Sequence, residues 1–323
     1  MSDDGDKYYL EDGVSLNDLM AGHITRNLKL IEEQLSLNLV ARDCFIAFSG
    51  TQPRVERCRK FLHELTEVYH LRGNYLDQND FEQTLKAFRD RRDDELRHLF
   101  AERIRVGKRK RDIVPRSKAQ LEYIRCIREK DIVFGVGAAG TGKTYLAMAL
   151  AVSELLNGNY NRIILTRPAK EAGENLGFLP GSLEDKIMPY LRPLYDALYD
   201  MIDFEEASAL IARNIIEVAP LAFMRGRTLN NAFIILDEAQ NTTEEQMLMF
   251  LTRLGFDSQC VITGDPSQND LGKDERSGLI HAEKALKEIP EIAFCRFGTD
   301  DVVRHTLVEK IIKAYQKDRK AAK

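Results

Sequence analysis

The sequence lacks the features that direct a chain into a membrane or through an export route. No apolar run approaches the about 20 residues that are needed to span a bilayer. The start of the chain, Met1 to Asp6, is acidic and has neither the basic nor the apolar region of a signal peptide. We therefore expect a cytoplasmic protein with no membrane partner.

Cysteines are few and lie far apart, at positions 44, 58, 126, 260 and 295. The sequence has no Cys-x-x-Cys pair and no nearby pair of histidines that would indicate a zinc site. An odd number of scattered cysteines is typical of reduced, buried thiols rather than of a disulfide framework. The sequence also contains no internal repeat and no low-complexity tract.

The composition allows one large domain and a smaller one, since the 323 residues are 44% hydrophobic and 30% charged. The net charge is only −4, but basic residues gather in two segments. These residues are Arg103, Arg105, Lys108, Arg109, Lys110, Arg111, Arg116 and Lys118 in the first segment, and Lys310, Lys313, Lys317, Arg319, Lys320 and Lys323 in the second. The clusters either contact the phosphates of a nucleic acid or form a solvated linker and tail.

The first third of the chain predicts a small α+β domain. Residues 1–20 show no periodicity, and we expect them to be disordered. In residues 21–100, apolar side chains recur at helical spacing from Ile24 to Leu35, two short strands follow at 38–42 and 44–48, and Pro53 suits the first turn of another helix. This order is KH-like, but the Gly-x-x-Gly clamp of a KH module is missing. The domain therefore either binds RNA or docks a protein partner.

A charged helix is expected over 79–100, followed by a basic linker at 101–116. Residues 117–323 then alternate strands with helices. Strands are expected near 131–136, 162–166, 215–219, 232–237, 258–263 and 292–296, and helices near 143–156, 184–200, 204–213, 243–254, 278–288 and 303–317. This alternation predicts an α/β domain with a mostly parallel sheet and helices on both faces.

The strongest motif fits the P-loop pattern Gly-x4-Gly-Lys-Ser/Thr. It comprises Gly137, Ala138, Ala139, Gly140, Thr141, Gly142, Lys143 and Thr144. An apolar strand precedes it and a helix-forming segment follows, so consecutive backbone N–H groups can turn around the phosphates of ATP. We expect Lys143 to reach the β- and γ-phosphates and the Thr144 hydroxyl to ligate Mg²⁺.

A pair of acids, Asp237 and Glu238, follows the buried strand that begins at Phe233. Ligands bind at the carboxyl ends of the strands in open α/β sheets. We expect Asp237 to hold Mg²⁺ through water and Glu238 to orient and deprotonate the attacking water. The alternative is that the acids cap the next helix.

Three further polar residues are candidates. Gln268 could sense the γ-phosphate, with Asp265 steadying it, unless Gly264 to Gln268 is an ordinary turn. Arg167 follows the second strand and lies either beside the phosphates or a nucleic acid, or in a solvated turn. Gln120 either reads adenine with its amide or lies on the surface.

These residues together resemble the PhoH-like ATPase family of bacteria over about residues 113–317. The matching segments are Gly135 to Thr144, Thr166 to Ala169, Glu171 to Glu174, Leu176 to Gly181, Pro189 to Tyr195, Met224 to Thr228, Asp237 to Gln240, Ile262 to Asp265 and Asp301 to His305. The resemblance implies one RecA-like domain, similar to a reduced superfamily 1 helicase core, that hydrolyses ATP with Mg²⁺ and works on RNA. It also implies association with an rRNA-processing endoribonuclease.

Only 55 residues follow Gln268, too few for a second RecA-like domain. One face of the nucleotide would therefore be open in a monomer. We expect a ring-like homo-oligomer in which a neighbour supplies an arginine, with Arg225, Arg227, Arg276 and Arg304 as candidates.

Three functions fit these features: an ATP-driven RNA remodeller or helicase, a nucleotide-gated RNA-binding or recruitment module, and a small-molecule kinase. The helicase-like order of the motifs argues against the kinase.

Overall fold

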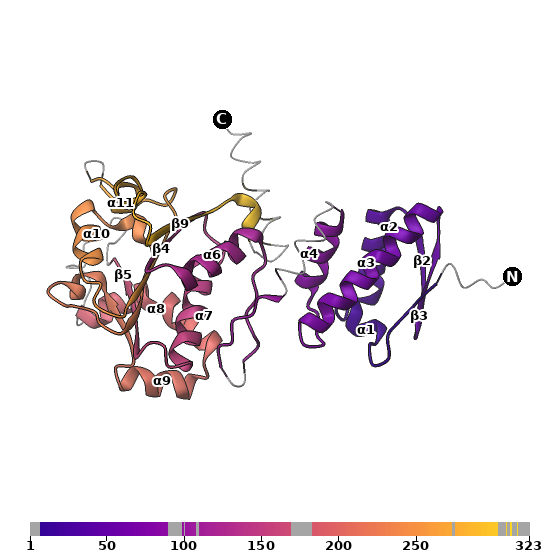
Figure 1. The fold of residues 1–323 in the computed structure, drawn as a ribbon, viewed down its shortest axis with the longest axis horizontal. Helices are drawn as coiled ribbons and strands as arrows, with labels where there is room; N and C mark the ends of the chain where they lie inside the picture. Colours follow the sequence, from indigo (N-terminus) through magenta and orange to yellow (C-terminus); the bar gives the residue numbers. More distant parts are fainter. Residues whose placement is uncertain are drawn as a thin grey trace. The chain divides into compact units, whose positions relative to one another are not determined.

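The computed structural model describes residues 7–89, 99, 101–107, 110–168, 183–272 and 275–302, together with residues 308, 311 and 315. The chain divides into two units, Met1–Glu102 and Arg103–Lys323 (Figure 1). Each unit has its own buried core, and each is described by itself.

The N-terminal unit packs helices against one face of a small antiparallel sheet with strand order β1-β3-β2. Its elements are β1 Lys7–Tyr9, α1 Leu16–Leu19, α2 Ile24–Leu35, β2 Asn38–Arg42, β3 Phe45–Ser49, α3 Gln52–Leu71 and α4 Gln78–Arg89. The expected order of helix, strand, strand and helix is therefore present. Residues 90–98 of the expected charged helix lie outside the described residues.

The expectation that residues 1–20 are disordered is wrong from Lys7 onward. Strand β1 pairs with β3, and the side chain of Ser15 caps α1. The hydroxyl of Tyr8 lies 3.0 Å from Thr66 Oγ1, and Leu19 is fully buried in the core. The elements in this segment are too short to produce a periodic pattern in the sequence. Contacts with distant residues order the segment instead.

The expectation of a basic linker at 101–116 is also wrong. Ile104 forms an isolated β-bridge with Ile113, and Ile104 and Val106 are buried in the core of the C-terminal unit. Lys110 Nζ donates to the carbonyl oxygen of Tyr199 at 2.9 Å. Apolar residues alternate with the basic ones in this segment, so it packs on the core through one face.

The C-terminal unit is built on a parallel six-stranded sheet with strand order β6-β5-β7-β8-β4-β9. The strands are β4 Ile132–Gly137, β5 Arg162–Arg167, β6 Ile216–Pro220, β7 Ala232–Leu236, β8 Gln259–Gly264 and β9 Ile292–Phe297. All lie close to their expected positions. Because β8 lies between β4 and β7, the carboxyl ends of these three strands meet at one edge.

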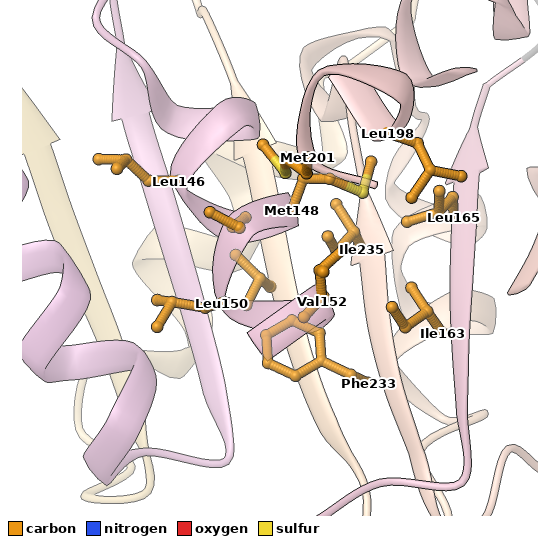
Figure 2. Close-up of a cluster of buried hydrophobic side chains, with 14 of the residues drawn as sticks. Leu146, Met148, Leu150, Val152, Ile163, Leu165, Leu198, Met201, Phe233 and Ile235 are labelled. Carbon is orange, nitrogen blue, oxygen red and sulfur yellow. The ribbon is translucent and has the colours of Figure 1, made fainter. Parts of the chain in front are cut away.

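Helices cover both faces of this sheet, as expected. They are α6 Lys118–Glu129, α7 Lys143–Leu156, α8 Leu183–Met201, α9 Phe204–Ala212, α10 Glu244–Leu251 and α11 Gly278–Leu286, with short 3₁₀ turns η3 Leu221–Met224, η4 Ala239–Asn241 and η5 Thr299–Asp301. Figure 2 shows Met148 and Val152 of α7 gathered with Ile163 of β5 and with Phe233 and Ile235 of β7. A second core, which includes Met247 and Phe250 of α10, covers the other face.

Two helices of this unit differ from what the sequence predicts or lie where the prediction is not tested. Helix α6 was not expected, and the helix expected over 303–317 lies almost entirely outside the described residues. Across both units all five cysteines are free, and Cys58, Cys260 and Cys295 are buried as expected, whereas Cys126 is half-buried and Cys44 is exposed. Within the described ranges, no helix has both the length and the apolar character needed to cross a membrane.

Candidate nucleotide site

A pocket of about 250 Å³ lies at the carboxyl ends of β4, β7 and β8. Its lining comes from three segments that are far apart in the sequence: Ala139, Gly140, Gly142, Lys143, Thr144 and Tyr145 from the P-loop and α7, Asp237 and Glu238 from the end of β7, and Gly264, Asp265 and Gln268 from the end of β8. The structure therefore brings the P-loop and the acid pair together in one place.

The backbone of the P-loop needs its glycines. Gly140 and Gly142 have φ of 81° and 83°, in the left-handed region that favours glycine. A Cβ at Gly137 would collide with the carbonyl oxygen of Phe297 on β9. Gly142 is also the N-cap of α7, so the amino end of a 14-residue helix faces the pocket. Free backbone N–H groups and the helix dipole at such an end favour a phosphate.

Lys143 lies folded within its own loop. Its Nζ donates to the carbonyl oxygens of Gly137 and Ala138, each at 2.8 Å. Burial lowers the pKa of Lys143, and the charges of Asp265 and Asp237 act in the opposite direction. A phosphate would offer the ammonium a charged acceptor in place of two neutral carbonyls, a stronger hydrogen bond.

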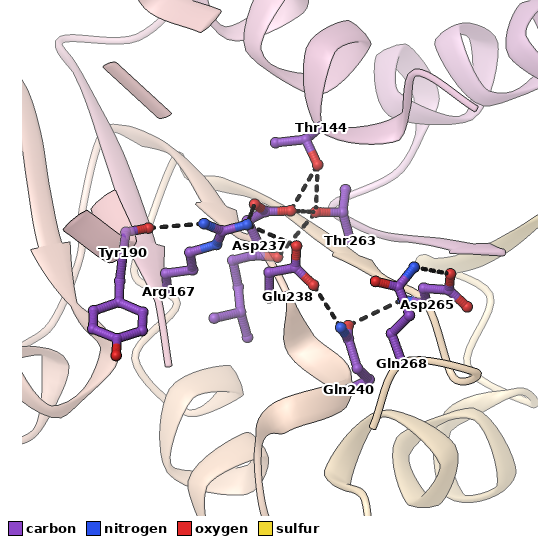
Figure 3. A network of polar contacts seen from close by, with 10 residues as sticks. Thr144, Arg167, Tyr190, Asp237, Glu238, Gln240, Thr263, Asp265 and Gln268 are labelled. Atoms are coloured by element: carbon purple, nitrogen blue, oxygen red, sulfur yellow. Dashed lines mark hydrogen bonds and ion pairs between the residues drawn. The ribbon is translucent and has the colours of Figure 1, made fainter. Parts of the chain in front are cut away.

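Asp237 is buried between the P-loop helix and β8. Its Oδ1 accepts from the hydroxyls of Thr144 at 2.6 Å and Thr263 at 2.7 Å, and its Oδ2 lies 3.1 Å from a guanidinium nitrogen of Arg167 (Figure 3). Hydroxyl and carboxylate oxygens are the ligands that Mg²⁺ prefers. In the part of the chain that is described, no group of three or more His, Cys, Asp or Glu side chains could hold a metal. One carboxylate and one hydroxyl fit Mg²⁺, because this ion takes most of its other ligands from water and phosphate.

Glu238 occupies an unusual position, with φ of 53° at the start of η4. Its Oε1 accepts from Arg167 at 2.7 Å and its Oε2 accepts from Gln240 at 2.5 Å. The alternative that the acids cap the next helix is wrong. Thr243 caps α10 through a capping box with Gln246, and Glu238 makes no capping hydrogen bond.

Asp265 ties the end of β8 to the P-loop. Its Oδ2 accepts from the backbone N–H of Ala139 at 3.0 Å and from Gln268 Nε2 at 2.7 Å, and its Oδ1 accepts from Ser267. Burial acts to raise the pKa of Asp265, but the hydrogen bonds from Ser267, Gln268 and Ala139 outweigh burial and lower it. The carboxylate is therefore ionised at neutral pH. Residues 265–268 do form a turn, in which the Gln268 N–H donates to the Asp265 carbonyl at 2.9 Å, and the side chain of Gln268 is held there by Asp265 beside the P-loop.

Gln120 is buried, so the alternative that it lies on the surface is wrong. It is 3% exposed, and its Oε1 accepts from the Arg116 N–H at 2.6 Å while its Nε2 donates to the Thr141 carbonyl at 2.9 Å. Both ends of the amide thus contact the backbone beneath the P-loop, and the side chain does not lie on the surface. The reason is α6, which turns Gln120 inward. Its contact with adenine stays a prediction.

Arg167 is not in a solvated turn. Its side chain is only 15% exposed, and it reaches both Asp237 and Glu238. Two further residues of the site, Thr263 and Gln240, were not expected from the sequence. The Oε1 of Gln240 accepts from the Asp265 N–H at 3.0 Å. Thr263 lies near the carboxyl end of the buried strand β8, and Gln240 lies in η4 shortly after the end of β7. A polar residue near the end of a buried strand was the signal that could have identified them.

The four candidate arginines separate in the structure. Arg227 forms a bidentate ion pair with Glu217 at 2.5 and 2.7 Å, and this hydrogen bonding lowers the pKa of Glu217 and raises that of Arg227. Arg227 is thus paired within its own chain, which makes it a weaker candidate for the arginine supplied to a neighbouring subunit. Arg225 and Arg276 are exposed. Arg304 lies outside the described residues.

The comparisons with known proteins agree on one family. A family profile described as "PhoH-like protein" matches residues 112–316. A PhoH-like protein of Bacillus subtilis is 47% identical over 290 residues, covering 90% of this chain and 91% of that protein. A PhoH-like protein of Synechocystis is 44% identical over 300 residues, with 92% and 90% covered.

Protein PhoH of Escherichia coli is 43% identical over 205 residues, which are 63% of this chain and 58% of that protein. Among solved structures, the Sulfolobus solfataricus SWI2/SNF2 ATPase core in complex with dsDNA covers 55% of this chain and 44% of its own, with 14% identity and a TM-score of 0.34. That likeness is too low to carry an argument, whereas the sequence matches extend over most of the chain. The chain therefore belongs to the PhoH-like protein family.

Proposed function

We propose that this protein binds ATP with Mg²⁺, hydrolyses it, and uses the cycle to remodel RNA, in RNA or rRNA processing. The observation that carries the proposal is the convergence of the P-loop and the acid pair on one pocket, where Thr144 Oγ1 donates to Asp237 Oδ1 at 2.6 Å. This is the arrangement that phosphoryl transfer by P-loop enzymes requires.

The side chains then take distinct roles. Lys143 and the backbone N–H groups of the P-loop bind the β- and γ-phosphates, and Thr144 and Asp237 hold Mg²⁺. Mg²⁺, when bound, neutralises charge on the phosphate oxygens. Glu238 orients the attacking water and accepts its proton. Gln268, which Asp265 holds in place, senses the γ-phosphate.

A neighbouring subunit completes the site in this proposal. Arg225 directly follows η3, which follows β6, the edge strand at the far side of the sheet from the P-loop strand. It is exposed, while Arg227 is paired with Glu217. In a head-to-tail ring, two different surfaces of each subunit meet, so a residue far from the nucleotide pocket of its own subunit can approach the pocket of the next. Arg225 is therefore our first candidate for the arginine supplied to the neighbour, ahead of Arg276.

RNA contact is supported by a pocket of about 660 Å³ in the N-terminal unit. It is lined by Lys7, Tyr8, Tyr9, Glu56, Arg59, Lys60 and His63, so cations outnumber the single acid. The ring of Tyr9 is 54% exposed and lies 5.9 Å from the ring of Phe45. Exposed aromatic rings beside basic groups stack the bases and neutralise the phosphates of single strands.

A second candidate function is a nucleotide-gated module that recruits RNA and hydrolyses ATP slowly. It is favoured by the two hydrogen bonds that occupy both carboxylate oxygens of Glu238. Strand displacement separates the two functions, since remodelling needs coupled hydrolysis. On the family resemblance, we also propose an rRNA-processing endoribonuclease as the partner.

Lys143→Ala is expected to weaken ATP binding. The loss of one charge-assisted hydrogen bond is worth about 1.5–3 kcal/mol, so the Kd should rise about 10- to 150-fold. Titration with a fluorescent ATP analogue in the presence of Mg²⁺ measures this. Lys130→Ala is the matched control. Lys130 precedes the amino end of β4, away from the P-loop, and its Nζ donates to the carbonyl of Pro290. Equal affinity in both variants would exclude Lys143 from phosphate binding.

Glu238→Gln is expected to keep ATP binding but to slow hydrolysis about 100-fold or more, the loss typical for a general base. Phosphate release measured with and without single-stranded RNA tests this and reports stimulation by RNA. Glu288→Gln, which changes an exposed acid paired with Lys287, should retain the wild-type rate. Normal turnover in Glu238→Gln would show that another group activates the water.

Tyr9→Ala and Lys60→Ala are expected to weaken binding of a labelled single-stranded RNA. Loss of one stacked base costs about 1–3 kcal/mol, or about 5- to 150-fold in affinity. Loss of one phosphate contact should also reduce the slope of log K against log salt by about 0.7. Fluorescence anisotropy at several salt concentrations measures both effects. Lys29→Ala removes an exposed charge outside this pocket and serves as control. Unchanged affinity in the pocket variants would favour protein docking instead.

Arg225→Ala is expected to lower ATPase activity about 10³-fold or more, as for other arginines supplied in trans. Co-expression of Arg225→Ala with Glu238→Gln should restore up to about a quarter of the wild-type rate. In a ring assembled at random from equal amounts of both variants, about a quarter of the interfaces pair an intact Glu238 with an intact Arg225. The same mixture with Arg276→Ala tests the second candidate. A fully active monomer in sedimentation would disprove the arrangement.

A further inference from the structure

Arg167 links three elements at the edge of the nucleotide pocket. It is the last residue of β5, and one guanidinium nitrogen lies 2.7 Å from Glu238 Oε1 and 3.1 Å from Asp237 Oδ2 (Figure 3). The other terminal nitrogen donates to the backbone carbonyl of Tyr190 on α8 at 2.8 Å. Arg167 thus holds both acids of the site from one side and α8 from the other.

This arrangement restrains Glu238 in its role as a base. A general base needs an oxygen that is free to accept a proton from water. Here Arg167 donates to Oε1 and Gln240 donates to Oε2, so each oxygen has already given one acceptor position to the protein and the carboxylate is held in place. A hydrogen bond from a guanidinium to a carboxylate is about twice as strong as a neutral one, so water does not readily displace Arg167.

We propose that Arg167 is a positioning residue that restrains Glu238 and so limits ATP hydrolysis until the pair separates. The inference rests on the proposed function, since it needs Glu238 to be the base. It adds a role for a residue that binds the carboxylates of the site. The same contact shares Asp237 between Arg167 and Mg²⁺, so Arg167 also competes with the metal.

Two details make the restraint releasable. The Nε of Arg167 is buried and has no hydrogen-bond partner among the described residues, so the arrangement leaves one donor unpaired. Helix α8 contains Pro189 and Pro193. Prolines distort the carbonyls of the preceding turn, and Tyr190, which accepts from Arg167, lies in the turn before Pro193. A shift of α8 would therefore move the anchor of Arg167 relative to the acid pair.

The test compares Arg167→Ala, Arg167→Gln and Arg167→Lys in the full-length chain. Without RNA, Arg167→Ala and Arg167→Gln should raise kcat about tenfold, the factor expected when one charge-assisted hydrogen bond to the base is lost. Arg167→Lys keeps the charge but cannot span both acids and Tyr190, so it should give a smaller rise. Stimulation by RNA, as a ratio, should fall in the same order. A kcat below the wild-type value in all three variants would overturn the proposal.

A second readout does not depend on turnover. Removing the competing guanidinium should lower the Mg²⁺ concentration that half-saturates binding of a fluorescent ADP analogue, whereas a damaged pocket would raise it. Arg162→Ala is the matched control, because Arg162 begins the same strand at the opposite end and donates to the Asn230 carbonyl at 3.2 Å. Its Mg²⁺ dependence and kcat should equal those of the wild type.

The double variant Arg167→Ala, Glu238→Gln separates this inference from the proposed function. If Arg167 acts through Glu238, the gain in kcat disappears in the double variant. If the gain persists, Arg167 acts elsewhere and the restraint is disproved, although ATP hydrolysis still stands. If the wild type and every variant lack ATPase activity with and without RNA, the proposed function fails first.

Discussion

The hydrogen bond between Thr144 and Asp237 is the contact on which the rest of the site depends. It joins residues 93 positions apart, at a distance of 2.6 Å. It can form because β8 lies between β4 and β7, so that the P-loop and the acid pair end on the same edge of a parallel sheet. Strands β7 and β8 are buried throughout, and this close packing fixes the position of the strand ends. The apolar core therefore determines where the polar groups meet.

Helix α6 supports the P-loop from the other side. Tyr123 is fully buried, and its ring packs where a Cβ on Gly135 of β4 would stand, at 2.9 Å. One turn earlier, Gln120 holds the carbonyl of Thr141 within the loop itself. The glycine in β4 and the amide in α6 thus act together: the first lets the helix approach the strand, and the second uses that approach to fix the loop. The loop is shaped before a phosphate arrives, which reduces the entropy that binding would otherwise cost.

The sequence predicted the sheet because six apolar runs, each followed by small or polar residues, leave few alternative folds. It predicted which residues line the pocket because those residues directly follow the strands. It could not predict the direction of Arg167 or Gln120, since each depends on a partner far away in the chain, Glu238 in one case and Thr141 in the other. The errors at 1–20 and 101–116 have the same origin. Charge dominates both segments, while a few residues such as Leu19 and Ile104 decide that they pack.

The charged groups of the pocket all have partners within the chain. Lys143 is bound by carbonyls of its own loop, Asp237 by two hydroxyls and Arg167, and Glu238 by Arg167 and Gln240. Binding of a nucleotide must therefore exchange contacts rather than add them, and the measured affinity is the difference between two sets of hydrogen bonds. The exchange at Lys143 is completed when phosphate binds. The contact between Arg167 and Glu238 is a separate one, and in our proposal it breaks independently of the exchange at Lys143. Binding and hydrolysis consequently depend on different bonds, and a change at Arg167 can alter the second without abolishing the first.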